Sequence, residues 1–205
     1  MLVKGGLDLR RKTKALCRIS LCALFSAVLC VVSPVAIPIF AIPFSLSILI
    51  VLLAAAMLGP IGGAVSILLY LLIGALGLPV FGGGMGGFGV LLGPTGGFLW
   101  SYLPMSLLFG WLYRAFQARE EETTRRTRIL LGILAGLPSL LICYTLGIIQ
   151  YMAVARVSFV AAVMVCVLPF LVFDLVKLAL VSFLSDRMKR IAVLRRIELD
   201  FFRKK

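Results

Sequence analysis

The sequence predicts an all-α integral membrane protein with six transmembrane helices, both termini cytoplasmic, and a glycine-rich extracellular loop between the third and fourth helices. Of its 205 residues, 62% are hydrophobic and 14% are charged, and the mean hydropathy is +1.14. Soluble domains have about 45–50% apolar and about 25% charged residues. At ~20 apolar residues for each span, the length allows about six helices. The basic residues gather at the ends of the apolar runs, which is the pattern of membrane topology signals.

Six apolar runs, separated by helix-breaking residues, give the helices in order. They are predicted to span the membrane at residues 15–33, 42–58, 61–77, 96–114, 129–149 and 168–187. Prolines between the first two runs predict an extended connection, because proline disfavours helix both for itself and for the residue before it. Gly59-Pro60 predicts a tight turn between the second and third runs. Pro169 suits the first turn of the last helix.

Residues 150–167 are apolar but follow a complete span. A single helix from Ser158 to Arg187 would be about 45 Å long at 1.5 Å per residue, well beyond a ~30 Å hydrocarbon core. We therefore expect residues 150–167 to form a lid or a short interfacial helix before the last span begins near Leu168.

The basic residues also predict the orientation. Six lie in the first 18 residues, five in 114–128 and eight from Arg187 onwards, which is nineteen of the twenty-one. With six spans these stretches share one face, and the positive-inside rule makes that face cytoplasmic. We expect one domain in the plasma membrane, with a basic tail at 1–14, a core at 15–187 and a basic amphipathic tail at 188–205. The last tail is predicted to lie on anionic lipid of the inner leaflet, and contact with a partner or a solvated tail are the alternatives.

The composition and motifs argue against several classes of protein. The net charge of +13 comes from topology signals and not from one basic patch, so nucleic acid is not an expected partner. The chain has no histidine and its five cysteines form no CxxC pair, so no metal or other cofactor is expected. There is no GxxxxGK[ST] loop, and the GxGxxG match at 82–87 lacks the strand and the downstream acid of a nucleotide site. We therefore do not expect an enzyme.

Two features are candidates for a binding site. Residues 74–97 contain eleven glycines, two prolines and no charge. Irregular backbone at membrane depth is tolerated where protein covers it or where it lines a cavity. Asp174 and Lys177 are charged residues well inside a span, and their i, i+3 spacing puts them on one helix face. Such charges cost roughly 2.5–3.5 kcal/mol each on insertion scales, so the pair indicates either a ligand site or a structural pair that fixes helix packing.

Four short segments occur together in a specific order. They are Gly59-Pro60-x-Gly62-Gly63, the run YLLIGALGLPVF at 70–81, the run GPTGGF at 93–98, and Pro169-Phe170 followed by Asp174-x-x-Lys177. Over roughly residues 15–190 this combination resembles the BioY family, the biotin-binding S-components of energy-coupling-factor (ECF) transporters. One departure is Ser47, which stands where the family tends toward glutamine.

The resemblance implies a six-helix membrane protein that captures extracellular biotin. The expected partners are a transmembrane coupling subunit and cytoplasmic ATPase subunits, whose ATP hydrolysis would drive release inside the cell. Ala23 and Ala27 match the small-residue face by which such components meet the coupling subunit, since small residues let helices approach closely. The same spacing also arises by chance in alanine-rich spans.

Biotin suits the two candidate features chemically. Its ureido ring offers two N–H donors and one carbonyl, and its tail ends in a carboxylate. Asp174 can accept an N–H, while Lys177 can donate to the ureido oxygen or to the carboxylate. The carboxylate is otherwise left to Arg156 or to backbone N–H groups at the Gly93–Gly97 helix start. The further expected ligand-binding residues are Phe81, Gly82, Gly83, Gly84, Met85, Phe88, Ser47, Tyr70, Tyr144, Gln150 and Arg156.

Three alternatives stay open on the sequence alone. An S-component for a different vitamin would keep the fold and change the site chemistry, since a cationic ligand would not need Lys177. A proton-coupled carrier would use Asp174 as its proton site, and its uptake would collapse with an uncoupler. A purely structural membrane protein would bind no vitamin saturably.

Overall fold

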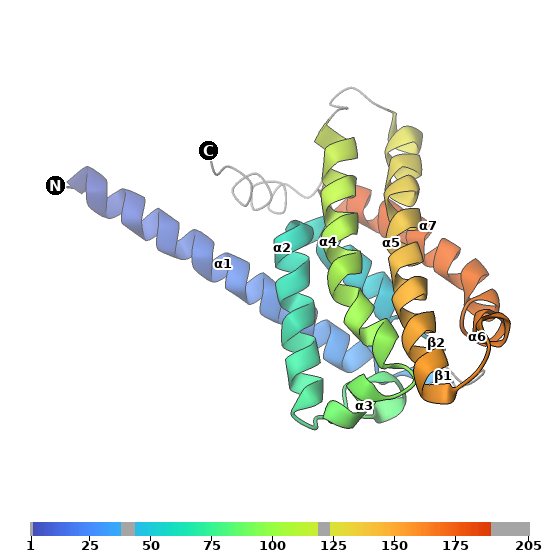
Figure 1. Ribbon diagram of the computed structural model, residues 1–205. Coiled ribbons are helices and arrows are strands. Elements are labelled where there is room, and N and C mark those ends of the chain that lie inside the picture. The colour runs from blue at the N-terminus through green and yellow to red at the C-terminus, as the bar shows by residue number, and fades with distance from the viewer. Residues whose placement is uncertain (1, 38–43, 119–123, 190–205) are drawn as a thin grey trace.

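The computed structural model describes residues 2–37, 44–118 and 124–189, and helices make up most of this part of the chain (Figure 1). The elements in order are α1 Leu2–Val32, β1 Ala36–Ile37, β2 Phe44–Ser45, α2 Ser47–Ala75, a 3-10 turn η1 Gly82–Gly84, α3 Phe88–Leu92, α4 Gly96–Ala118, α5 Arg125–Ala155, α6 Phe159–Cys166 and α7 Leu168–Lys189. Four described helices are long and apolar enough to cross a membrane, and they are Ala15–Val32 within α1, α2, α5 and Leu168–Met188 within α7. The predicted all-α membrane class is therefore confirmed.

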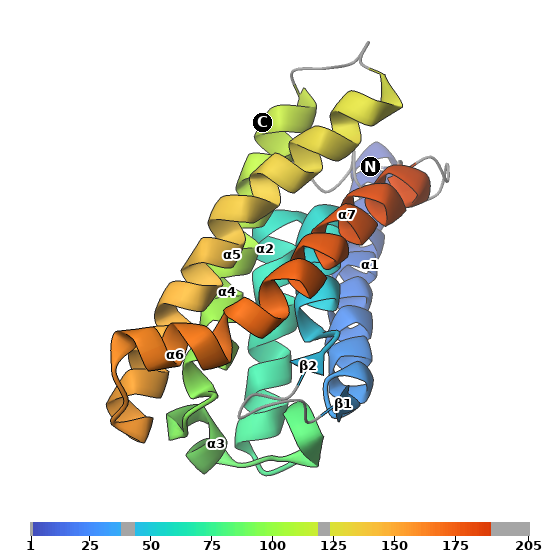
Figure 2. The ribbon, with the colours of Figure 1, turned by 90° about the vertical axis from the view of Figure 1, so that its right-hand side faces the viewer.

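The turn predicted at Gly59-Pro60 divides α2 into two arms, residues 47–58 and 60–75. Gly59 has φ 78° and ψ −175°, which is a backbone conformation open almost only to glycine. A Cβ on Gly63 would lie 2.9 Å from the Cα of Ala55, so the second arm runs back along the first. Figure 2 shows the two arms side by side. The predicted turn is confirmed.

Several helices continue beyond the spans expected from hydropathy. α1 begins at Leu2 and includes the described part of the predicted basic tail, residues 2–14, and α5 runs on to Ala155. Hydropathy marks where side chains change polarity, whereas a helix satisfies its own backbone hydrogen bonds and can continue into water. Of the predicted amphipathic tail at 188–205, Met188 and Lys189 complete α7, and residues 190–205 lie outside the described residues.

The region 150–167, expected to form a lid or a short interfacial helix, is divided between two helices. Its first residues complete α5, and residues Phe159–Cys166 form the short helix α6. Arg156 separates them in a left-handed conformation, with φ 55° and ψ 41°. The hydroxyl of Ser158 then accepts a hydrogen bond from the Ala161 N–H, and such a cap fixes the start of a helix. α6 therefore turns away from α5 and leads into α7.

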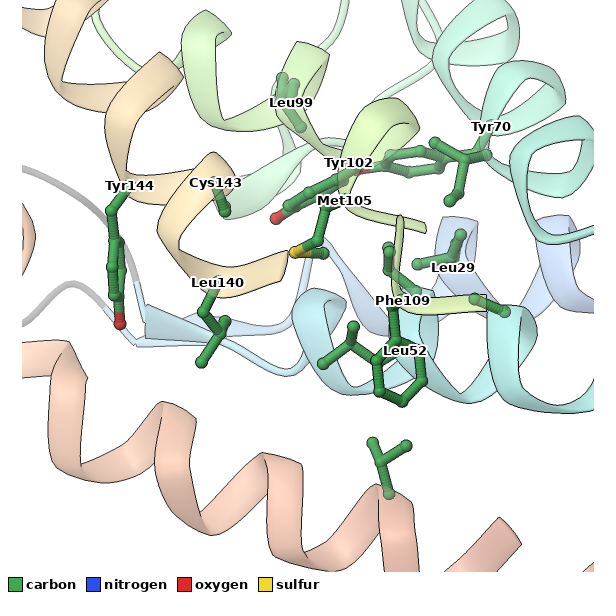
Figure 3. Close-up of a cluster of buried hydrophobic side chains, with 14 of the residues drawn as sticks. Leu29, Leu52, Tyr70, Leu99, Tyr102, Met105, Phe109, Leu140, Cys143 and Tyr144 are labelled. Atoms are coloured by element: carbon green, nitrogen blue, oxygen red, sulfur yellow. The ribbon is translucent and has the colours of Figure 1, made fainter. Parts of the chain in front are cut away.

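Small residues allow α5 to pack closely against both α4 and α7. A Cβ on Gly132 would lie 2.5 Å from Ser182 Oγ, and one on Gly136 would lie 2.2 Å from a Leu178 methyl group. On the α4 side, a Cβ on Gly147 would lie 2.2 Å from the ring of Phe98. Glycine at such positions lets membrane helices approach through van der Waals contact. The buried cluster between these helices includes Tyr102, Cys143 and Tyr144 (Figure 3).

The two ends of the helical bundle differ in character. β1, β2, α3 and α6 lie together at one end, whereas α4 ends and α5 begins at the other (Figures 1 and 2). At the second end, the guanidinium groups of Arg125 and Arg128 lie 3.4 Å and 3.2 Å from the carboxylate of Asp186. These ion pairs join the start of α5 to the end of α7, and the first end is left for the candidate site.

Candidate ligand-binding site

Asp174 and Lys177 form a buried ion pair on α7. Lys177 Nζ lies 2.8 Å from Asp174 Oδ1, and the two residues are 4% and 1% exposed respectively. The Tyr144 hydroxyl on α5 donates to Asp174 Oδ2 at 2.6 Å, and Lys177 donates to the backbone carbonyl of Ser45 on β2 at 2.8 Å. The pair is therefore held from both sides, and charge is balanced within it.

A cluster of aromatic rings lies on the Lys177 side of the charged pair. Lys177 Nζ lies 4.3 Å from the centroid of the Phe44 ring, close enough for a cation–π interaction. Phe44 in turn stacks on Phe170 at 6.4 Å and lies 5.0 Å from Phe173. Burial of Asp174 and Lys177 strengthens the electrostatic contact between them, because the effective dielectric constant is lower there than in water.

Two adjoining pockets open beside this pair. The pocket at the ion pair, called the α7 pocket here, is lined by Phe44, Ser45, Ile48, Phe98, Tyr102, Tyr144, Cys166, Phe170, Asp174 and Lys177. The pocket under the glycine-rich loop, called the loop pocket, is lined by Ser33, Ser45, Phe81, Gly82, Met85, Val90, Thr95, Phe98, Leu99 and Tyr102. The shared residues Ser45, Phe98 and Tyr102 make them neighbours.

The glycine-rich loop folds over the loop pocket. Phe81 is fully buried against Gly74, and its ring meets Tyr70 edge-on at 5.5 Å. The Phe81 N–H donates to the Met85 carbonyl at 2.8 Å, which closes a tight loop over Gly82–Gly84. Gly83 has φ 75°, a conformation that residues with a Cβ rarely adopt. Glycine is therefore what allows the backbone to turn this sharply above the pocket.

Hydroxyl groups link the two pockets to the core. Ser45 Oγ donates to Ser47 Oγ at 2.8 Å, and Ser47 Oγ donates to Ser33 Oγ at 2.9 Å. Ser33 Oγ and the Tyr70 hydroxyl share a hydrogen bond of 2.7 Å. This chain joins the end of α1, the β2 strand and both arms of α2, so it fixes the side of the site opposite α7.

The structure brings some of the predicted site residues together and leaves others apart. Those that line a pocket are Asp174, Lys177, Tyr144, Phe81, Gly82 and Met85. Ser47 and Tyr70 stand behind the wall in the hydroxyl chain. Gly83, Gly84, Phe88, Gln150 and Arg156 do not line either pocket. Phe88 is 55% exposed, and the Gln150 amide is engaged by backbone carbonyls.

Sequence reasoning missed several lining residues, of which Tyr102 is the most central because it borders both pockets. The sequence does indicate Tyr102, because it lies one helical turn after Phe98, the last residue of the GPTGGF segment. The two side chains therefore lie on the same face of the helix. Cys166 was also missed. Burial raises the pKa of its thiol to about 11, so at neutral pH it borders the α7 pocket as an uncharged group.

Replacing Tyr144 by phenylalanine is expected to weaken ligand binding by roughly tenfold or more, because the carboxylate of Asp174 would lose the hydrogen bond that holds it beside the α7 pocket, and hydrogen bonds to charged groups contribute about 1.5–3 kcal/mol. The change removes the hydroxyl that bonds to Asp174 at 2.6 Å and keeps the ring. The measurement is equilibrium binding of biotin, the ligand that the family resemblance implies, to the purified protein in detergent. Unchanged affinity in a folded variant would exclude a role for this hydroxyl in the site.

The fold is that of a helical membrane protein with two adjoining pockets at one end of its bundle. Residues 8–193 match the sequence pattern of the BioY family. The chain is 36% identical over 172 residues to a probable biotin transporter BioY of Pyrococcus horikoshii, covering 83% of this chain and 95% of that protein. It is 33% identical over 173 residues to the biotin transporter BioY of Thermotoga maritima, covering 83% and 94%. The chain belongs to the BioY family.

A solved structure has the same fold. The crystal structure of the S-component for biotin from an ECF-type ABC transporter superposes with a TM-score of 0.76, covering 87% of this chain and 93% of that one at 22% identity. The fold of this chain is thus the fold of that S-component.

Proposed function

We propose that the protein binds biotin at the two pockets and serves as the substrate-capture subunit of an ECF-type transporter. The observation that carries the proposal is the buried Asp174–Lys177 pair, which borders the α7 pocket with Tyr144 beside it. The two relatives are a probable biotin transporter and a biotin transporter, and the structural neighbour is an S-component for biotin, which supports the same ligand.

The ureido group of biotin matches the α7 pocket. Asp174 would accept a ureido N–H. The ureido oxygen would accept from Lys177, which keeps one N–H beside those given to Asp174 and Ser45, whereas the single Tyr144 hydroxyl hydrogen is already donated to Asp174. A neutral ligand group suits an ion pair whose two charges already balance, because a carboxylate there would face Asp174 as well as Lys177.

The tail of biotin would then extend into the loop pocket. A second ring and four methylene groups separate the ureido group from the carboxylate, so a single ion pair can receive one end only. Thr95, within the turn at residues 93–97, lines the loop pocket, whereas Arg156 is exposed and lines neither pocket. This favours the turn as the partner of the carboxylate.

Equilibrium binding of labelled biotin to purified protein tests the proposal. Saturable binding that unlabelled biotin displaces, and that thiamine and riboflavin do not, is the expected result. The exposed Thr145 on α5 offers a matched control, since Thr145→Val changes a polar group away from both pockets and should leave affinity unchanged. No binding by a folded wild type would overturn biotin as the ligand.

The finer membrane arrangement is also part of the proposal. Six spans follow if each arm of α2 and the whole of α4 cross the bilayer together with the ends of α1, α5 and α7. Both termini would be cytoplasmic and the glycine-rich loop extracellular. The gathering of Arg125 and Arg128 at the end opposite the pockets supports this orientation. Reporter fusions at the termini and in the loop test it.

The expected partners are a transmembrane coupling subunit and cytoplasmic ATPase subunits. Only 17% of the Ala15–Val32 segment of α1 is buried, the lowest fraction among the four candidate spans. Ala23 and Ala27 are both exposed on it. An exposed stripe of small residues suits close contact with another membrane helix.

Changing Ala23 and Ala27 to leucine is expected to reduce biotin uptake by roughly tenfold or more in cells that contain the coupling subunit and ATPases. The larger side chains would keep α1 from packing closely against a helix of the coupling subunit. Biotin binding to the purified variant should match the wild type, since neither residue borders a pocket. Normal uptake would place the interface elsewhere.

A further inference from the structure

Gln150, near the end of α5, holds the outer wall of the loop pocket. Its Nε2 donates to the backbone carbonyl of Leu91 at 2.9 Å and to that of Gly93 at 2.8 Å. A single amide nitrogen thus bonds to the last turn of α3 and to the start of the turn that leads into α4. Both of its hydrogens are used for these two carbonyls, which leaves none to donate to a ligand.

The segment that Gln150 holds is part of the pocket wall. Val90 and Thr95, on either side of the two bonded carbonyls, line the loop pocket. α3 has only five residues, too few to be stable by itself. In the described part of the chain, its carbonyl at Leu91 also accepts from Trp100 Nε1 at 3.1 Å. The wall therefore depends on side chains of α4 and α5 for its position.

The neighbouring glycines leave room for this contact. A Cβ on Gly96 would lie 2.5 Å from Gln150 Nε2, and one on Gly97 would lie 2.8 Å from Gln150 Cβ. Real Cβ atoms do not approach so closely, so a larger residue at Gly96 would displace the amide. A larger residue at Gly97 would also meet the backbone oxygen of Leu146 at 2.5 Å and would push the start of α4 away from α5. The two glycines of the GPTGGF segment thus leave the space that the Gln150 side chain occupies.

We propose that Gln150 is a positioning residue that orders the α3 wall, residues 88–95, before the ligand arrives. A ligand that meets a wall already in place does not have to order it on binding, which raises the apparent affinity. The effect on biotin rests on the proposed function, whereas the effect on the wall does not. Gln150 thereby acts through Val90 and Thr95 and does not itself touch the ligand.

Hydrogen–deuterium exchange of the ligand-free protein in detergent tests the ordering directly. Gln150→Leu removes both donors and keeps the approximate size of the side chain, and Thr145→Val on the same helix is the control. Exchange over residues 88–97 is expected to be roughly fivefold faster or more in Gln150→Leu, with the rest of the protein and the control unchanged. Wild-type exchange over this segment in the folded variant would overturn the proposal.

Biotin binding supplies the second readout. Gln150→Leu is expected to bind biotin roughly fivefold more weakly or worse, and saturating biotin should return the exchange of residues 88–97 to the wild-type level. Recovery of this kind would not follow from a general loss of stability. Faster exchange with unchanged biotin affinity would overturn the link between wall and ligand. A wild type that binds no biotin would refute the proposed ligand while leaving the exchange result to decide on the wall.

Discussion

Replacement of Lys177 by methionine should remove measurable biotin binding and lower the stability of the protein by about 3–5 kcal/mol, the usual cost of breaking a buried ion pair from one side. Methionine keeps the length of the side chain and removes the ammonium group. Asp174, 1% exposed, would keep its Tyr144 hydrogen bond but lose its counter-charge at 2.8 Å. The carbonyl of Ser45 would lose its donor at the same time.

The double variant Asp174→Asn with Lys177→Met separates folding from binding. It removes both charges, so the uncompensated buried charge that makes the single change costly is absent. The asparagine carbonyl can still accept from Tyr144. We therefore expect the double variant to recover most of the stability lost in Lys177→Met while biotin binding stays absent.

Thermal unfolding in detergent and biotin titration of the three proteins are the measurements. A double variant as unstable as Lys177→Met would mean that Lys177 stabilises the fold mainly through Ser45 and Phe44. Biotin binding retained in the double variant would exclude the ion pair from the ligand site and leave it as the structural pair that the sequence also allowed.

The membrane class, the turn at Gly59 and the placing of Asp174 with Lys177 could be predicted because each depends on local sequence. Apolar runs mark membrane segments, a Gly-Pro pair breaks a helix, and i, i+3 spacing puts two side chains on one face. None of these needs knowledge of which helices pack together.

The partners of the ion pair could not be predicted in the same way. Ser45 is separated from Lys177 by 132 positions, and Tyr144 from Asp174 by 30, so these contacts appear only once α5, α7 and β2 are assembled. Gln150 illustrates the same limit. An amide near a predicted site suggests a ligand contact, but in the folded protein two backbone carbonyls bond to it first.

The second large effect is expected at Gly59, far from the ligand. Gly59→Ala should destabilise the protein by about 3 kcal/mol or more, from two separate causes. The backbone at φ 78° and ψ −175° costs a residue with a Cβ about 1–3 kcal/mol. That Cβ would also lie 1.0 Å from Arg114 Nη2, so the guanidinium would have to move and give up its hydrogen bond of 3.0 Å to the Leu58 carbonyl.

Arg114 thereby closes the first arm of α2. A cation that bonds to the last carbonyls of a helix satisfies groups without an internal partner and interacts favourably with the helix dipole. A hydrogen bond from a charged donor of this kind contributes about 1.5–3 kcal/mol. Arg114→Ala alone should therefore cost a similar amount, since it leaves the Leu58 carbonyl without this donor.

The two changes should not add. Once Arg114 is alanine, the Cβ at position 59 meets no guanidinium, so Gly59→Ala should then cost only its backbone strain. The loss of stability in the double variant should therefore be smaller than the sum of the two single losses, by about 1.5 kcal/mol or more. Gly89, whose added Cβ would meet nothing within 4 Å, provides the control, and Gly89→Ala should be close to neutral in thermal unfolding. If the two costs are additive, Arg114 does not occupy the space above Gly59, and backbone strain alone explains why glycine is needed where α2 turns back.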